Sequence, residues 1–160
     1  MANFKTADLC DEHASKVQVC DLDFRSYGNR KRFSGKIETV RVYEDNVLFL
    51  KALESVPTGS VIVVHGGGSK NCALMGGRLA GIAVSRGLAG VIINGCVRDS
   101  ADLASMDIGI FALGTNPLKS KKNGIGERDV SFSFGNVHWT PGDYVYADED
   151  GVIVSKTALL

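Results

Sequence analysis

Two short apolar runs, separated by one helix-sized segment, constrain the fold of this chain more than any other feature. The runs are SVIVV (60–64) and AGVIIN (89–94), and both are rich in β-branched residues. Continuous runs of this kind are typical of strands that are covered on both faces. Segment 70–86 between them places Met75 and Leu79 at helical spacing. The three segments therefore predict a right-handed βαβ unit with parallel strands.

Further elements continue the alternation of helices and strands. The predicted helices are 6–17, with Thr6 as a candidate N-cap, and 45–56, with Asp45 as a candidate cap. The predicted strands are 36–44, 108–113 and the short C-terminal segments 130–134, 137–140 and 151–155. Glycine-containing turns separate the last three segments, which favours antiparallel pairing. We expect an α/β fold with a parallel βαβ core and antiparallel C-terminal strands.

Length and charge exclude several classes of protein. A chain of 160 residues is long enough for one substantial core and short for two domains. Lys and Arg together number 18, as do Asp and Glu, so the chain has no global basic field for direct nucleic-acid binding. The apolar runs are shorter than a membrane span, and acidic residues stand near the N-terminus. The four cysteines show no CxxC spacing. We expect a soluble, cytoplasmic chain with reduced thiols and no membrane partner.

The pair Arg98–Asp99 follows directly after the second apolar run. Ligands of open α/β sheets collect at the carboxyl ends of the strands, so this pair is a candidate site. A guanidinium grips a carboxylate through two hydrogen bonds, and a neighbouring carboxylate can hold Mg²⁺ or Mn²⁺ together with water and substrate oxygens. Metal and arginine together would stabilise the enolate of a small 2-oxo acid. The alternative interpretation is a turn closed by a salt bridge.

Gly76 and Gly77 interrupt the segment that is expected to be helical. Each glycine costs roughly 1 kcal/mol relative to alanine in a helix interior. The pair indicates either a break in the helix or close packing of the helix on the sheet. If the helix restarts after the glycines, the N–H groups of residues 76–79 can bind an anion. The glycines at 66–68 do not form a dinucleotide fingerprint, because Asn71 stands at the third glycine position.

Other polar residues have simpler interpretations. The basic clusters Arg30–Arg32 and Lys119–Lys122 lie in polar connections and are interpreted as solvated loops. His65, at the end of the first apolar run, is interpreted as a hydrogen-bonded structural residue rather than a proton carrier.

These residues, taken together, resemble a known family. The stretch VVHGGGSKNCALMGGRLAGIAVSRGLAGVIINGCVRD is similar to the signature region of the RraA-like family, which includes the regulator of ribonuclease E activity A and the class II 4-hydroxy-4-methyl-2-oxoglutarate aldolases. Further segments resemble the family in order: LCDEH, FSGKIETVRVYEDN, LGTNPLKSKKNGIGE and PGDYVYADEDGVIVS. The resemblance implies a single RraA-like domain over 1–160, a three-layer β/β/α swivelling-type fold, and a homotrimer with sites near the subunit boundaries.

The resemblance also implies roles for particular residues. In the aldolase branch a backbone segment binds the substrate carboxylate, and the matching residues here are Gly76, Gly77, Arg78 and Leu79. The residue matching Arg98 binds the 2-oxo acid, and the one matching Asp99 holds the divalent metal. Arg98 and Asp99 are therefore the expected catalytic residues, with Mg²⁺ or Mn²⁺ as the cofactor.

Gly77 departs from the aldolase pattern, in which an acidic residue at this place serves proton transfer through water. Decarboxylation chiefly needs a metal and an electron sink, whereas retro-aldol cleavage also needs a base. We therefore expect a metal-dependent lyase that forms pyruvate, with oxaloacetate decarboxylation preferred to cleavage of 4-hydroxy-4-methyl-2-oxoglutarate. The competing hypothesis is a non-catalytic trimer that binds and inhibits a ribonuclease of the ribonuclease E type, or another protein partner.

Overall fold

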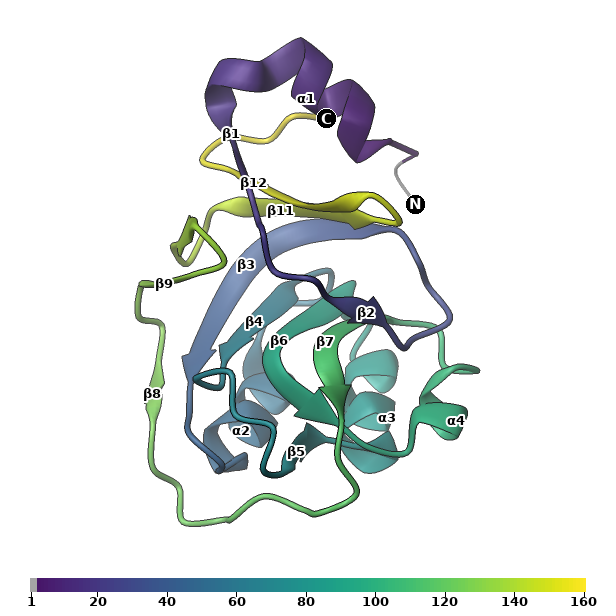
Figure 1. Ribbon diagram of the computed structural model, residues 1–160, viewed down its shortest axis with the longest axis vertical. Helices are drawn as coiled ribbons and strands as arrows, with labels where there is room; N and C mark the ends of the chain where they lie inside the picture. The colour runs from purple at the N-terminus through teal and green to yellow at the C-terminus, as the bar shows by residue number, and fades with distance from the viewer. Residues whose placement is uncertain (1–2) are drawn as a thin grey trace.

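The two apolar runs form neighbouring parallel strands in the middle of a mixed sheet (Figure 1). They are β4 (Val61–His65) and β6 (Gly90–Val97), joined through helix α3 (Gly77–Ser85), in a computed structural model that describes residues 3–160. Every residue of β6 is buried. The predicted parallel βαβ unit is confirmed.

The other elements surround this unit. The remaining helices are α1 (Thr6–His13), a 3₁₀ turn (Ala14–Lys16), α2 (Val47–Ser55) and α4 (Ser100–Leu103). The remaining strands are β1 (Val17–Val19), β2 (Arg25–Ser26), β3 (Phe33–Arg41), β5 (Ala73–Met75), β7 (Gly109–Thr115), β8 (Glu127–Arg128), β9 (Phe132–Phe134), β10 (Val137–Trp139), β11 (Tyr144–Asp148) and β12 (Gly151–Ser155).

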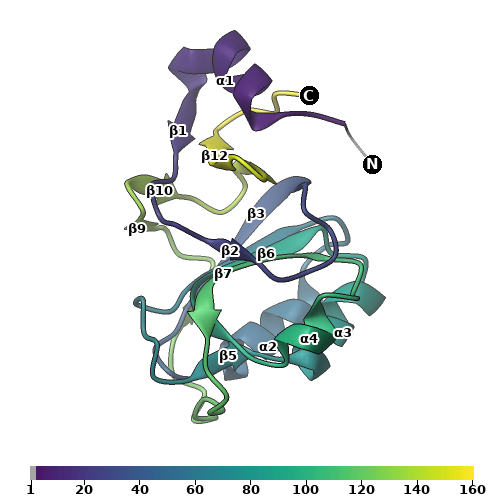
Figure 2. The same cartoon turned by 45° about the vertical axis from the view of Figure 1, so that its right-hand side comes forward.

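The molecule has three layers. Strands β3, β4, β6 and β7 form a parallel sheet, with α2 and α3 on one face (Figure 1). The antiparallel strands β1, β12 and β11 form a second layer over the other face, and α1 lies at the far side of that layer (Figure 2). This arrangement confirms the expected three-layer β/β/α fold with antiparallel C-terminal strands.

Alternate residues of β4 enter two different cores. Ile62 and Val64 contribute to the core between the sheet and the helices, whereas Val61 and Val63 contribute to the core between the two strand layers. Side chains alternate between the two faces of a strand, so a strand that is covered on both faces is apolar at every position. This is the physical reason why the run SVIVV is continuous.

Strand β3 connects the two layers. Its first part pairs with β11 in antiparallel fashion through residues 33–36, and its second part pairs with β4 in parallel through 37–41. Phe33 is the first residue of β3, and its ring is edge-on to the Phe111 ring, with the ring centres 5.2 Å apart. A Cβ atom at either Gly90 or Gly109 would overlap the Phe33 ring, so both positions accommodate only glycine beside it.

The structure corrects several local predictions. Residues 73–75 form strand β5 beside the end of β6, so the predicted helix 70–86 is too long and begins only at Gly77. Thr6 does not cap α1, because it is the first helical residue and its hydroxyl donates to Asp148 at 2.7 Å. The predicted strand 36–44 lies three residues earlier, and β11 was not among the predicted strands.

Asp45 does interact with the start of α2, but from one residue before the N-cap position, which is Asn46. Its Oδ1 accepts a hydrogen bond from the Val47 N–H at 3.0 Å. Its other oxygen accepts from the Asn123 N–H at 2.6 Å. Asp45 therefore ties the start of α2 to the segment that follows β7.

Two further predictions concern thiols and membranes. All four cysteines are free. Within residues 3–160, no helix is both long and apolar enough to cross a membrane.

Candidate functional site

The segments that leave the carboxyl ends of the parallel strands converge on one pocket of about 80 Å³. Asn46 follows β3, Gly76 precedes α3, Arg98 and Asp99 follow β6, and a lysine-rich segment follows β7. Residues from all four segments line the pocket. The structure thus brings Arg98 and Asp99 together with the glycines of α3, as the sequence predicted.

Asp99 links two of these segments. It stands at the start of α4 in the left-handed backbone conformation, with φ 59° and ψ 38°. Its Oδ2 atom accepts a hydrogen bond from the Gly77 N–H at 2.8 Å. A Cβ atom at Gly76 would lie 2.5 Å from that same oxygen and 3.1 Å from Arg98 Cγ. The close approach of Asp99 therefore requires a glycine at position 76.

The first turn of α3 supplies donors for an anion. Gly76 is the N-cap and Gly77 the first helical residue, so the glycine pair marks the start of α3, and the residues before it form strand β5. N–H groups of a first helical turn have no carbonyl partner within the helix. Because Asp99 already binds the Gly77 N–H, the donors that remain for a ligand are those of Arg78 and Leu79.

Arg98 is held by its backbone and leaves its guanidinium near the pocket. Its N–H donates to the Met75 carbonyl at 2.9 Å, and its Nη1 makes a long contact of 3.4 Å to the Pro117 carbonyl. In the described part of the chain no ion pair joins Arg98 to Asp99, and the alternative of a salt-bridged turn is wrong. The guanidinium is available to a ligand.

Two lysines complete a cationic lining that the sequence interpretation missed. Lys119 and Lys122 line the pocket, and Lys122 Nζ donates to Asn46 Oδ1 at 3.3 Å. Asn46 is itself buried and donates to the Leu74 carbonyl at 3.0 Å. The lysines are exposed, as expected of a solvated loop, but the loop also borders the pocket, which the interpretation did not include. The sequence does place these lysines after a predicted strand of the parallel sheet, and ligands collect at the carboxyl edge of such a sheet. This position could have indicated that they lie near the site.

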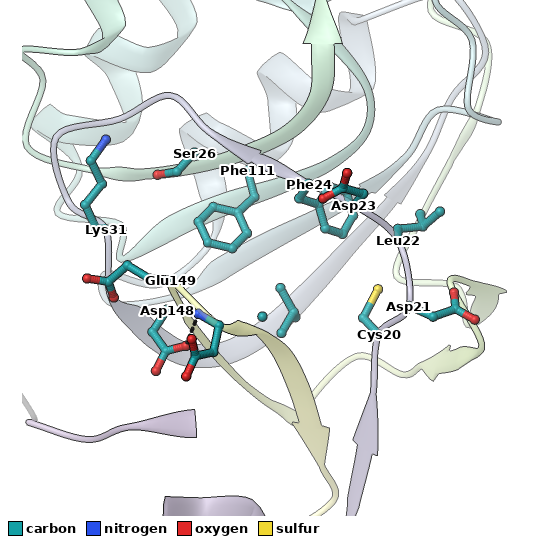
Figure 3. Close-up of a pocket in the computed structure, with 13 residues that line it drawn as sticks. Cys20, Asp21, Leu22, Asp23, Phe24, Ser26, Lys31, Phe111, Asp148 and Glu149 are labelled. Carbon is teal, nitrogen blue, oxygen red and sulfur yellow. Dashed lines mark hydrogen bonds between the residues drawn. The ribbon is translucent and has the colours of Figure 1, made fainter. Parts of the chain in front are cut away.

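A larger cavity of about 470 Å³ lies elsewhere and has the opposite charge (Figure 3). Its walls carry five carboxylates, of Asp21, Asp23, Asp148, Glu149 and Asp150. Phe24 and Phe111 also line it, and Lys31 is its one lysine (Figure 3). Carboxylates repel an anionic substrate. The small cationic pocket at the carboxyl edge is therefore the candidate site for a 2-oxo acid.

Comparison with known proteins identifies the family. The family model RraA-like, described as Aldolase/RraA, matches residues 6–154. The chain belongs to the RraA-like family. This confirms the resemblance seen in the signature region, and a fold match supports it: the chain superimposes on the "RNA-processing inhibitor RraA from Thermus thermophilis" with a TM-score of 0.93 and 42% identity, over 97% of this chain and 94% of that one.

Other RraA-like relatives carry different functional names. A Bacillus cereus protein, 54% identical over 98% of both chains, is named "Putative 4-hydroxy-4-methyl-2-oxoglutarate aldolase". A Geobacillus kaustophilus structure, 60% identical with a TM-score of 0.97 over 98% of this chain and 97% of that one, is described as an S-adenosylmethionine: 2-dimethylmenaquinone methyltransferase. Relatives that share one fold thus carry three different functional names, so the fold alone does not give the function of this chain.

The RraA-like fold accommodates a side chain at Gly77. A Cβ atom there would lie 3.6 Å from Asp99 Oδ2 and 4.0 Å from Asp99 Cβ, which are ordinary contact distances. An acidic side chain at this position, as the aldolase pattern has, would therefore begin beside Asp99. The backbone therefore leaves room for an acidic side chain at position 77, although this sequence has glycine there.

The residues present fit a divalent cation held by a single protein carboxylate. Among residues 3–160, no group of three His, Cys, Asp or Glu side chains is placed to hold a metal. The Asp99 Oδ1 atom makes no hydrogen bond to the described residues, and Asp99 is one of the residues that line the pocket. Mg²⁺ keeps several waters and needs only one or two carboxylates together with substrate oxygens. Asp99 is the residue that would hold it.

His65 lies outside this pocket and is confirmed as a hydrogen-bonded residue. Its Nδ1 accepts from the Gly67 N–H at 3.2 Å and lies 3.2 Å from Asn94 Nδ2. Its ring packs against both Phe132 and Phe134, with ring centres 5.1 and 5.2 Å away. Burial, with a smaller effect from Arg41, lowers the pKa of His65 below its ordinary value.

Proposed function

We propose that this protein is a divalent-metal-dependent lyase that releases pyruvate from small 2-oxo acids, and that it prefers oxaloacetate decarboxylation to aldol cleavage. One observation carries the proposal: Arg98, Asp99 and the first turn of α3 line the same pocket at the carboxyl edge of the sheet. The relatives that are named as aldolases support the lyase class. The four free thiols agree with a cytoplasmic location.

Each part of the pocket has a role in binding a dicarboxylic 2-oxo acid. The N–H groups of Arg78 and Leu79 receive one carboxylate, and the Arg98 guanidinium binds the 2-oxo end of the substrate. Lys119 and Lys122 add positive charge on the other wall, where a second carboxylate would lie. A substrate with two carboxylates therefore matches the charge of the pocket better than one with a single carboxylate.

A divalent cation held by Asp99 would supply positive charge against the negative charge that develops on the 2-oxo oxygen. The cationic side chains around Asp99 oppose binding of a free cation. Binding of the anionic substrate reduces that repulsion. We therefore expect metal affinity to be much higher in the presence of a 2-oxo acid than in its absence.

The direct test measures pyruvate release from oxaloacetate with Mg²⁺ or Mn²⁺, corrected for decay caused by the metal alone. We expect Asp99→Asn to lower turnover by about a hundredfold or more, because the variant loses the charged ligand. The matched control is Asp102→Asn, an exposed aspartate in the same short helix α4, which should retain turnover. Turnover that survives in Asp99→Asn, or an absence of turnover above the metal-only rate, would overturn the proposal.

Gly77→Asp tests why aldol cleavage is expected to be the weaker activity. The new side chain has room beside Asp99 and would supply the missing proton-transfer group. We expect the ratio of aldol cleavage of 4-hydroxy-4-methyl-2-oxoglutarate to oxaloacetate decarboxylation to rise by about a hundredfold, the lower end of the range for general acid–base catalysis. Gly77→Asn, which has the same shape without the acid, is the control. An equal rise in both variants would contradict the assignment.

A second candidate function rests on the likeness to the RNA-processing inhibitor structure, which extends over nearly the whole chain. Under it the protein is a homotrimer that binds a ribonuclease and lowers its activity without catalysis of its own. The two functions separate in one experiment, in which parental protein and Asp99→Asn are added to a ribonuclease of the ribonuclease E type. Equal inhibition by both proteins, together with trimer formation in sedimentation velocity, would support the regulator function independently of the lyase site.

A further inference from the structure

Another cavity, of about 290 Å³, lies at the opposite end of the parallel strands from Arg98. Gly59 and Gly87, which border it, precede the amino ends of β4 and β6. Phe4 and Phe33 give it an apolar wall. Its position at the amino ends separates it from the lyase pocket, so the inference below does not depend on the proposed function.

The charge of this cavity is entirely positive. Its charged lining residues are Arg30 and Arg32, and no carboxylate is among the residues that line it. The acidic partners of the two arginines lie outside the lining: Arg30 pairs with Asp107 at 3.2 Å and Arg32 with Glu149 at 3.6 Å. The two carboxylates are 74% and 67% exposed, and ion pairs of this kind contribute little.

Both guanidiniums also have unused donor capacity. The Nε atoms of Arg30 and Arg32 are buried and have no hydrogen-bond partner among the described residues. The Nη1 contacts are long, at 3.4 Å to the Ala89 carbonyl and 3.3 Å to Asn3 Oδ1. Because both Nε atoms are closed off from solvent, a ligand in the cavity would meet the Nη groups, whose present hydrogen bonds are long.

The two arginines lie close together in the sequence and enter the same cavity. Arg30 and Arg32 are two residues apart in the segment directly before β3, and both line this cavity. Lys31 between them borders the acidic cavity instead, with its Nζ bonded to the Gly28 carbonyl at 3.0 Å (Figure 3). The cluster RKR is therefore not one solvated loop, since its side chains serve two cavities of opposite charge.

We propose that this second cavity binds a phosphate monoester with an apolar body. Such a group carries close to two negative charges at neutral pH and three acceptor oxygens, which match two guanidiniums better than one carboxylate does. The apolar body would lie against Phe4 and Phe33. Arg32 is already placed over the Phe4 ring, with its Cζ atom 6.0 Å from the ring centre.

The test is a calorimetric titration of the full chain with phenyl phosphate, with benzoate and inorganic phosphate in separate runs. We expect saturable binding of phenyl phosphate and weaker binding of both other probes. Arg30→Gln and Arg32→Gln should each lower its affinity roughly tenfold to a hundredfold, the loss expected for a charge-assisted hydrogen bond. Arg25→Gln, an exposed arginine in nearby β2, is the matched control and should bind normally.

Arg32→Lys keeps the positive charge, so it tests the role of the guanidinium even if Arg32→Gln fails to fold. It should bind phenyl phosphate more weakly than the parental protein, because an ammonium does not match two oxygens. Absence of saturable binding, unchanged affinity in the Arg30→Gln and Arg32→Gln variants, or equal affinity for benzoate would each overturn the proposal. Binding that is lost in Arg98→Ala but kept in Arg32→Gln would place the probe in the other pocket and overturn it as well.

Discussion

The pocket at the carboxyl edge and the aromatic core between the two strand layers are built in opposite ways. The core is filled: Trp139 is fully buried, and Gly90 and Gly109 leave no space beside the Phe33 ring. The pocket is formed by chain segments that follow strands, and Asp99 at its edge is exposed. The comparison teaches that stability and chemistry lie in separate parts of this molecule. Substitutions in one part should therefore leave the property of the other largely unchanged.

Trp139→Ala is expected to have the largest effect, and on stability. The indole stacks on Phe134 at 4.9 Å and its Nε1 donates to the Phe134 carbonyl at 3.2 Å. Loss of a buried tryptophan side chain typically lowers the free energy of unfolding by about 3–5 kcal/mol. Urea denaturation would measure this loss, with exposed Val19→Ala as the control. If the folded fraction of the variant also lost its turnover, the separation of the two regions would be wrong.

Gly76→Ala and Gly77→Ala sharpen the comparison within the pocket. Gly76 has an extended backbone that alanine can adopt, so the damage would come from contact of the new Cβ with Asp99 Oδ2. We expect turnover to fall about tenfold to a hundredfold, the loss that a displacement of about 1 Å in a site can cause. Gly77→Ala should keep decarboxylation, because a Cβ atom there meets Asp99 only at ordinary contact distances. Equal turnover in both variants would show that Gly76 is not needed for the site.

The smallest expected effect is on the pH dependence of stability. Because burial lowers the pKa of His65 in the folded chain, the unfolded chain binds more protons below the ordinary histidine value of 6.5. The free energy of unfolding should therefore decrease as pH falls below that value. His65→Gln should reduce the slope. Urea midpoints between pH 5 and 8 would show whether the slopes differ.

The sequence predicted the parts of the fold that depend on continuous local patterns. The runs at β4 and β6 are recognisable because both faces of each strand are buried. The start of α3 was placed wrongly because Met75, four residues before Leu79, fits the apolar stripe of the helix although it belongs to a strand. Only a long-range contact, the pairing of Ala73 with Cys96 on β6, makes this segment a strand. Pairing of that kind leaves no periodic signal in either segment.

The residues of the candidate site were likewise predictable only where they follow a strongly patterned strand. Arg98 and Asp99 follow an unmistakable strand, so their place at the sheet edge could be inferred. Lys119 and Lys122 follow the shorter run of β7 in a charge-rich segment, and nothing local distinguishes them from a solvated loop. Asn46 was hidden for another reason, because its role depends on hydrogen bonds to Leu74 and Lys122, both distant in sequence.

The open position at Gly77 has a genetic consequence. Glycine codons become aspartate or glutamate codons through a single change of the second base. Since the backbone already leaves room for that side chain beside Asp99, the proton-transfer group of an aldolase lies one mutation away. Under the proposed lyase function, two proteins that differ in their balance of aldol cleavage and decarboxylation could therefore be separated by one substitution and share the same backbone.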